Sequence, residues 1–340
     1  MAEVVCLGEA LIDFVAMQSG VEVGAASSFV RAPGGAPANV AVGVARLGHT
    51  SAFLGKVGDD PFGRFLAETL AQAGVDTGGM VLDPVHRTGL AFVSLTADGE
   101  RDFCFFRHPS ADSTYAPEEL DRARIASGRI FHFGSITLIE EPARSTTLAA
   151  LGEARAANLL VSYDPNLRPP LWPDLTAARK GILHAAPFAD IVKVSEEELV
   201  FLMEEGDKVP DPPIAEERVA ASAERFLEQH PELKLLAVTR GARGCSWWTP
   251  HRAGKSLPGL RVQAVDATGA GDGFVAGLLV GLLERHLAEG KKLATAEESA
   301  LEAVLTQANA VGALTVTQKG AIPALPTAAQ LAQFRRQVGA

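Results

Sequence analysis

The segment 266–272, Asp-Ala-Thr-Gly-Ala-Gly-Asp, has residue types and spacing suited to phosphate chemistry. A strand-like stretch, 260–265, precedes it and a small apolar run, 273–280, follows, so the glycines fall where a strand would pass into a helix. The first amides of a helix lack intrahelical acceptors, carry the positive end of the dipole, and are accessible to an anion where glycines flank them. The pattern predicts an anion site. Asp272 lies in the first turn, where phosphoryl transfer needs a proton acceptor for an attacking hydroxyl. The alternative is a tight turn with an acid that complements the dipole.

Two further groups have side chains suited to binding a polyol. Asp13 follows a buried strand-like segment, 4–11, and the carboxyl ends of strands are where α/β sheets bind ligands. Gly34 and Gly35 precede a helical pattern that contains Asn39, so the backbone can approach a ligand closely and Asn39 offers both a donor and an acceptor. The alternatives are a loop acid that caps a turn, a plain glycine turn and a capping Asn39.

Three basic residues are placed where they can meet an anionic ligand. Arg107 ends a β-rich run, and its alternative is a lone surface arginine. Arg168 lies in a proline-held loop after a strand-like segment, 159–163, so it is pre-organised for substrate or phosphate oxygens. Lys193 lies inside an apolar strand-like run, where it needs a partner such as an ATP phosphate.

Two local patterns have weaker functional readings. Ser195 and Glu198 match a capping box, which accounts for both residues without a ligand. The Thr239-x-Gly241-x-x-Gly244 spacing weakly resembles a phosphate turn, and a β segment rather than a helix follows it. It is therefore no dinucleotide fingerprint, which argues against a dehydrogenase, and no Walker sequence occurs in the chain.

Strand and helix patterns alternate along most of the chain, which is typical of an α/β fold with a doubly wound sheet. The runs 88–96 and 101–107 interrupt the alternation. They are joined by Ala-Asp-Gly-Glu, 97–100, and predict a hairpin. Since consecutive strands without a helix do not belong in such a sheet, we assign this hairpin, with part of 14–31, to a small β lid. Its phenylalanines would cover a site or pair with another subunit.

The composition indicates a globular chain without a nucleic-acid surface. It has 340 residues, 47% of them hydrophobic, and 31 basic against 41 acidic residues give a formal charge of −10 with no Lys/Arg block. Cys6, Cys104 and Cys245 are predicted to be reduced core residues. No leader-like or membrane-spanning run is present, so we expect a cytoplasmic protein with no membrane partner.

Taken together, these motifs resemble the PfkB-type (ribokinase-like) carbohydrate kinases, and within them the fructokinases of bacteria and plants. The similarity covers nearly the whole chain. The segments that carry it are 34–42, 106–112, 162–168, 193–198, 266–274 and 320–326.

This resemblance implies a single domain over 1–340, a three-layer α/β/α sandwich with a mostly parallel central sheet, and a β lid formed by about 14–31 and 88–107. It implies ATP and Mg²⁺, and K⁺ near the anion hole. It also implies a homodimer formed through the lid. The activity it implies is phosphorylation of D-fructose to fructose 6-phosphate. The alternatives are a kinase of 2-keto-3-deoxygluconate or ribose, or a non-catalytic sugar-binding protein on the same fold.

The resemblance also assigns roles by position. Asp272 is the base, and the amides of Gly269, Ala270 and Gly271 form the anion hole. Sugar hydroxyls are assigned to Asp13, Gly34, Gly35, Asn39, Arg107 and Arg168. The nucleotide is assigned to Lys193, Glu198, Thr239, Gly241, Gly244 and Asn309, with Glu198 also holding Mg²⁺ through water. Asp266 and Thr268 belong to the monovalent-cation loop.

The chain departs from the family pattern at three positions. Ala267 stands where a second Thr is usual, Gly273 where Ala is frequent, and Ser195 where the wider family has Asn. The first two bear on the rigidity of the loop and on the cation site. None of the three removes a group that the chemistry requires.

Overall fold

The computed structural model describes residues 1–96 and 101–338, and within them it has two sheets. The nine strands of the main sheet lie in the order β13-β12-β11-β10-β9-β8-β1-β4-β5. Their bounds in chain order are β1 Val4–Leu7, β4 Ser51–Gly58, β5 Asp76–Asp83, β8 Ile130–Phe133, β9 Leu160–Tyr163, β10 Ile191–Ser195, β11 Leu235–Thr239, β12 Cys245–Thr249 and β13 Arg252–Leu257. The strands from β11 to β5 pair in parallel, whereas β12 and β13 are antiparallel, so the sheet is mostly parallel as predicted.

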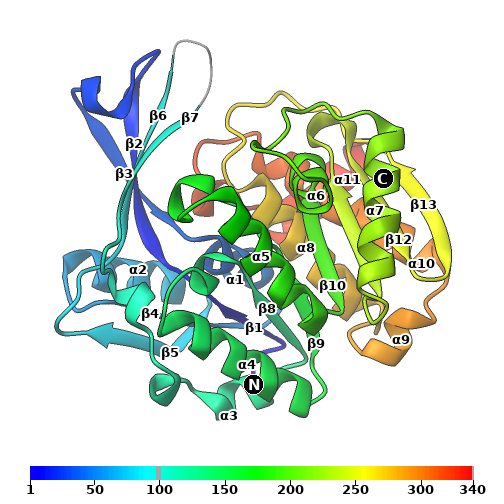
Figure 1. The fold of residues 1–340 in the computed structure, drawn as a ribbon, viewed down its shortest axis with the longest axis horizontal. Helices are drawn as coiled ribbons and strands as arrows, with labels where there is room; N and C mark the ends of the chain where they lie inside the picture. Colours follow the sequence, from blue (N-terminus) through cyan, green and yellow to red (C-terminus); the bar gives the residue numbers. More distant parts are fainter. Residues whose placement is uncertain (97–100, 339–340) are drawn as a thin grey trace.

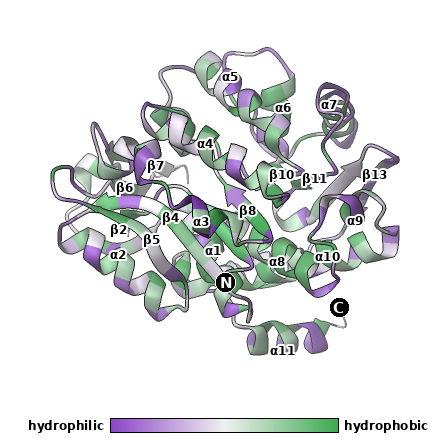
Figure 2. Cartoon of the chain, turned by 90° about the horizontal axis from the view of Figure 1, so that it is seen from below, coloured by the Kyte–Doolittle hydropathy of each residue, from purple (hydrophilic) through white to green (hydrophobic). Residues whose placement is uncertain are grey.

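Helices cover both faces of the main sheet (Figures 1 and 2), which gives the predicted three layers. One face carries α1 Ala36–Arg46, α2 Pro61–Gln72, α8 Ala270–Glu284 and α10 Glu298–Thr315. The other carries α3 Arg122–Ala126, α4 Ala143–Ala156, α5 Leu175–Ala185, α6 Glu196–Met203 and α7 Glu216–Gln229. The short α9 Gly290–Ala294 and the outer α11 Ala328–Val338 complete the described helices. None of the helices in the described ranges is long and apolar enough to cross a membrane.

Strand β1 shows why one sheet supports two cores. Its four residues are fully buried, and alternate side chains point to opposite faces. Val4 and Cys6 join the core under α1 and α8, whereas Val5 and Leu7 join the core under α4 and α5. The continuous apolar sequence of this strand follows from burial on both sides.

A separate small sheet has the order β3-β2-β6-β7 and stands at one side of the main sheet (Figure 1). Its strands are β2 Leu11–Ser19, β3 Phe29–Gly34, β6 Leu90–Leu95 and β7 Arg101–Phe106. The predicted hairpin is confirmed by the antiparallel pairing of β6 with β7. Its predicted turn, 97–100, lies outside the described residues. Phe92 stacks on Phe14 with 4.9 Å between ring centroids, and Phe14 meets Phe62 of α2, so aromatic packing joins this sheet to the body.

Three local predictions were wrong. The strand predicted over 4–11 is two strands in different sheets, because the chain leaves the main sheet after Leu7. The stretch 260–265 is not a strand. It alternates apolar and polar residues but has no paired neighbour, and only Leu260 and Val262 pack on the core. Cys104 is exposed on the edge strand β7, whereas Cys6 and Cys245 are buried.

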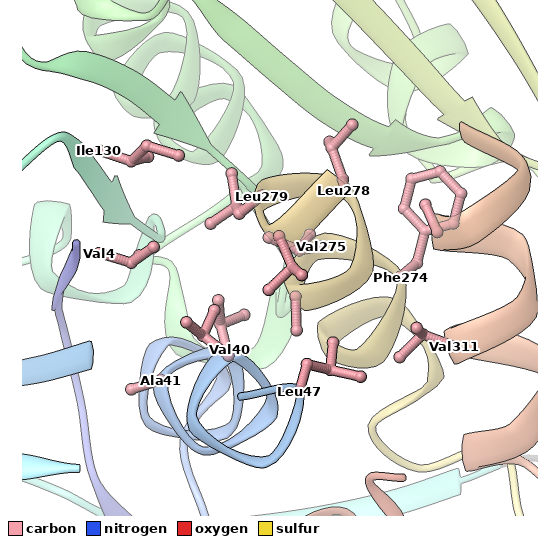
Figure 3. Close-up of a cluster of buried hydrophobic side chains, with 14 of the residues drawn as sticks. Val4, Val40, Ala41, Leu47, Ile130, Phe274, Val275, Leu278, Leu279 and Val311 are labelled. Carbon is pink, nitrogen blue, oxygen red and sulfur yellow. The ribbon is translucent and has the colours of Figure 1, made fainter. Parts of the chain in front are cut away.

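Helix α8 is buried along nearly its whole length, between the main sheet, α1 and α10 (Figure 3). Val275 and Leu279 lie near Val4, Val40 and Ile130 in the same core. Glycines allow the close approach on both sides. A Cβ on Gly43 of α1 would lie 2.5 Å from the Cβ of Ala276, and one on Gly277 would lie 2.9 Å from the Cα of Ala308 in α10.

Candidate active site

The start of α8 is shaped by a glycine and held by an acid. Gly269 is the N-cap residue with φ 78°, the left-handed region, and a Cβ there would lie 2.8 Å from the Cβ of Ala321. The Asp266 carboxylate accepts from the amide and hydroxyl of Thr268 at 2.9 and 2.7 Å, and from the amide of Gly320 at 2.9 Å. These bonds fix the loop that presents the first amides of the helix.

Asp272 lies in the first turn of α8 and is 9% exposed. The Nδ2 of Asn39 donates a hydrogen bond of 2.7 Å to Oδ2 of Asp272. Burial raises the pKa of Asp272 to about 6, against the opposing effects of the Asn39 bond and the positive charges of Lys193 and Arg168. A carboxylate whose pKa lies this close to neutrality is suited to accept a proton from a hydroxyl.

Lys193 lies beside this helix start. Its Nζ is 3.1 Å from Oδ2 of Asp164, which follows β9, and a Cβ added to Gly271 would lie 3.0 Å from the same Nζ. Burial disfavours the ammonium, but the charges of Asp164 and Glu198 outweigh it and raise the pKa of Lys193. The partner that the sequence required for this lysine is therefore a carboxylate of the protein, and the ammonium lies next to the start of α8.

The residues predicted to bind sugar gather around the start of α1, which reaches Asp272 through Asn39. A Cβ on Gly34 would lie 2.2 Å from Oδ2 of Asp13 across the β2–β3 pair, so only glycine leaves room for that carboxylate. Gly35 has φ 109°, and a Cβ there would lie 2.2 Å from the carbonyl oxygen of Glu9. The Oδ1 of Asn39 is buried without a hydrogen-bond partner, so it is available to a ligand hydroxyl.

The two predicted arginines differ in their contacts. Arg107 is buried and its Nη2 pairs with Asp112, so the alternative of a lone surface arginine is wrong. Its Nε is buried and has no partner. Arg168 is half-buried and donates from Nη1 to the carbonyl oxygen of Leu167 at 3.0 Å. Since its charge acts on Asp272, it lies within electrostatic reach of the helix start.

The predicted nucleotide residues follow β10 and β11. The capping box is confirmed, because Ser195 Oγ accepts from the Glu198 amide at 3.3 Å and Glu198 Oε2 accepts from the Ser195 amide at 2.8 Å. The other Glu198 oxygen accepts from the Leu167 amide at 2.7 Å. The Glu198 carboxylate therefore braces the loop that carries Arg168.

The remaining predicted nucleotide residues differ in the space around them. Gly241 has φ 55° and open space where a Cβ would be, whereas a Cβ on Gly244 would lie 2.2 Å from the carbonyl oxygen of Leu257. Thr239 ends β11 with its hydroxyl 3.4 Å from the carbonyl oxygen of Val194. On α10, Asn309 has a buried Nδ2 without a hydrogen-bond partner. Gly244 thus serves close backbone packing.

Sequence reasoning gave no role to two buried acids at this site. Asp164 pairs with Lys193, and Glu9 accepts from the Ala36 amide at 2.9 Å. Asp164 follows a buried strand directly and Glu9 follows one after a single glycine, which is the signal that singled out Asp13.

Comparisons with known proteins identify the family of the chain. The model of the pfkB family carbohydrate kinases matches residues 1–328. "Probable fructokinase-7" of Arabidopsis thaliana is 52% identical over 324 residues, which cover 95% of this chain and 90% of that protein.

Among solved structures, the chain is also similar to fructokinases. The fructokinase of Xylella fastidiosa with bound ATP has a TM-score of 0.87 at 35% identity, with full coverage of both chains. A fructokinase double mutant of Vibrio cholerae O395, in a form with bound fructose, ADP and potassium ion, has a TM-score of 0.80 at 36% identity and 98% coverage of each chain. The chain belongs to the pfkB family of carbohydrate kinases.

Proposed function

We propose that this protein transfers the γ-phosphoryl group of ATP to a primary hydroxyl of D-fructose, giving fructose 6-phosphate. The observation that carries the proposal is the placement of Asp272 in the first turn of α8, bonded to Asn39 on one side and near the Lys193 ammonium on the other. The similarity to fructokinases over nearly the whole chain supports fructose as the acceptor.

The proposed acceptor side consists of Asp13, Gly34, Gly35 and Asn39, with Arg107 and Arg168 nearby. The sugar hydroxyl loses its proton to Asp272, and the amides of residues 269–271 stabilise the negative charge on the transferring group. Since the transition state of phosphoryl transfer is loose, positioning and charge stabilisation lower most of the barrier, and the base can act late.

The donor side is proposed to lie along residues 193–198, Thr239, Gly241, Gly244 and Asn309. The Lys193 ammonium, held by Asp164, is placed to meet an ATP phosphate without an unpaired charge in the free protein. Because the neighbouring backbone leaves space at Gly241, the nucleotide can approach the chain there.

Metal ions are proposed to assist. Mg²⁺ typically keeps several waters and binds one or two carboxylates together with substrate phosphates, which fits a site whose described residues contain no cluster of three or more His, Cys, Asp or Glu. Glu198 would hold it through water, since both carboxylate oxygens accept backbone amides. The loop of Asp266 and Thr268 supplies carboxylate and carbonyl oxygens of the kind K⁺ requires. When bound, these ions neutralise phosphate charge.

The test is a coupled ADP-release assay over fructose, ribose and 2-keto-3-deoxygluconate with ATP, with and without K⁺. We expect fructose to give the highest kcat/KM. Replacing Asp272 by Asn or Ala should lower kcat on the order of 10²–10⁴-fold, as is typical for a positioned acid-base group. A folded Asp272→Asn protein with near-normal turnover would refute the role of the base, and sugar binding without turnover by the wild type would indicate a binding protein.

A further inference from the structure

A buried carboxylate outside the proposed catalytic set lies against the sugar side of the site. Glu9 is 2% exposed and lies in the short connection between β1 of the main sheet and β2 of the small sheet. Its Oε1 accepts a hydrogen bond of 2.9 Å from the amide of Ala36, the first residue of α1. The N-cap residue of α1 is Gly35, which has no side chain to cap the helix. Glu9 therefore supplies, from a distant segment, an acceptor for the first free amide of a helix that has no capping side chain of its own.

The bond from Glu9 acts on the backbone that carries Asn39. Gly35 is held at φ 109° against the Glu9 carbonyl oxygen, and its own carbonyl oxygen accepts from the amide of Asn39 at 2.9 Å. Asn39 in turn donates to Asp272. A continuous set of contacts thus leads from Glu9 through the first turn of α1 to the proposed base, and the same turn places Gly34 against Asp13.

Two charged side chains, Arg107 and Asp112, act on the Glu9 carboxylate in addition to its bond with α1. Burial raises the pKa of Glu9 to about 7, Arg107 lowers this pKa and Asp112 raises it. Arg107 and Asp112, which follow β7 of the small sheet, form a buried ion pair. The carboxylate therefore lies where the start of α1 meets the segment that leaves the small sheet.

We propose that Glu9 is a positioning residue for the sugar subsite. Its carboxylate fixes the amide of Ala36, so that the Gly34–Gly35 turn and Asn39 are held in one arrangement against Asp13 and Asp272. The sugar acceptor is that of the proposed function, but the role of Glu9 does not depend on which sugar the protein uses. It predicts a defect confined to the sugar side, because none of the contacts that carry it reaches the predicted nucleotide residues.

The first test compares Glu9→Ala with Glu9→Gln. Loss of the acceptor in Glu9→Ala should raise the KM for the sugar on the order of 10- to 100-fold, with a smaller fall in kcat and a KM for ATP within about twofold of the wild type. The amide oxygen of Glu9→Gln can still accept from Ala36, so this variant should restore the sugar KM to within about fivefold of the wild type.

The second test removes the donor instead of the acceptor. Ala36→Pro deletes the amide hydrogen at the first helical position, where proline is tolerated. It should reproduce the sugar KM of Glu9→Ala, and the double variant should be no worse than either single variant, because both changes remove the same bond. If Glu9→Ala fails to fold, the comparison of the single variants Ala36→Pro and Glu9→Gln still measures the contribution of the bond.

A matched control separates positioning from general loss of stability. Asp190 also accepts the amide of a buried strand, that of Val161 at 2.8 Å, and pairs with Lys234, but it lies at the amino end of β10, whereas the site lies beyond the carboxyl end of this strand. Asp190→Ala should lower the thermal midpoint without changing the sugar KM.

Three outcomes would overturn the proposal: an unchanged sugar KM in Glu9→Ala, an equal rise in the KM for ATP, or additive effects of Glu9→Ala and Ala36→Pro. The assays use the best sugar of the wild-type panel. A wild type that prefers a sugar other than fructose therefore contradicts the proposed function without affecting this test. Calorimetric titration of the sugar without ATP gives the same comparison independently of turnover.

Discussion

At the scale of single residues, the site combines three buried charged side chains that act on one another and one neutral donor. Asp272 and Asp164 are both acids near one ammonium, Lys193, and only Asn39 gives Asp272 a neutral donor. Lys193 bonds to Asp164, so the carboxylate of Asp272 is left less well compensated. Burial is the main cause of the raised pKa of Asp272, and the negative charge of Asp164 adds to it.

The pH dependence of turnover follows from this arrangement. A base must be unprotonated to act, so kcat/KM for the sugar should fall as the pH drops through about 6 and should level off above it. Because Asp272, Asp164 and Lys193 interact, the profile reports the group of residues rather than Asp272 alone. The measurement is a steady-state profile from pH 5 to 8.5, with the coupling enzymes checked separately at each pH. A rate that rises toward pH 5 would contradict the assignment of Asp272 as the base.

At the scale of elements, α1 and α8 cross in the core and both begin at the site. They come close at Gly43 and Ala276, about one turn from Asn39 and Asp272 respectively, so the separation of the helices also sets the distance between the two proposed subsites. Since interiors are close-packed, an added methyl group at this contact must move one helix.

Gly43→Ala should therefore impair both stability and turnover. The methyl group would lie 2.5 Å from the Ala276 Cβ, and we expect a net loss of about 1–2 kcal/mol in the free energy of unfolding, since overpacking costs more than the gain in helix propensity. The kcat of Gly43→Ala should also fall, because the shift of one helix changes the distance between the two proposed subsites. The control is Gly152→Ala in α4, where no atom lies within 4 Å of the added Cβ; it should gain about 0.5–1 kcal/mol and keep its activity. Urea unfolding and steady-state kinetics of both variants give the comparison, and equal behaviour would contradict the packing argument.

Local sequence patterns predicted the helices and strands better than they predicted which distant segments contact one another. The alternation of strands and helices, the Ser195–Glu198 capping box and the β6–β7 hairpin are local patterns, and all three are confirmed. The predicted strand at 260–265 was wrong because pairing depends on a neighbour that the local sequence does not reveal. The role of Glu9 as an acceptor for a helix 27 residues away could not be derived from spacing either. The sequence did predict that Lys193 needs a partner, but only the adjacency of β9 and β10 identifies Asp164.

At the scale of the whole molecule, the small sheet offers an apolar surface next to the site. Val15 and Val30 are paired neighbours on β2 and β3, and these two and Met17 are 43%, 53% and 67% exposed. Asp13 and Val15 project from the same face of β2, since they are two residues apart in a strand. This face extends outward from the proposed sugar site, which supports the proposal that the small sheet acts as a lid and pairs two copies of the chain.

Charging this surface should separate the copies. Val15→Lys with Met17→Lys should shift the protein from dimer to monomer in light scattering coupled to size exclusion, because two lysines cannot be buried against an apolar partner. Val85→Lys is the control, as Val85 is 74% exposed outside both sheets and should leave the assembly unchanged. A wild type that is monomeric at all concentrations would refute the lid-mediated dimer. If the sheet also excludes water, the lysine variant should hydrolyse more ATP in the absence of sugar.

The order of the elements along the chain has a consequence for how such an enzyme changes its sugar preference. The proposed sugar contacts before residue 110 come from β2, β3, the start of α1 and the residue after β7, whereas the proposed nucleotide contacts come from β10, α6, β11 with the turn after it, and α10. One contiguous stretch of sequence thus holds most of the acceptor contacts. A recombinant that exchanges residues 1–126 with those of a relative should inherit the relative's choice of sugar, provided that the junctions at α1–α8 and β1–β8 are repacked, while its nucleotide affinity stays that of the parent.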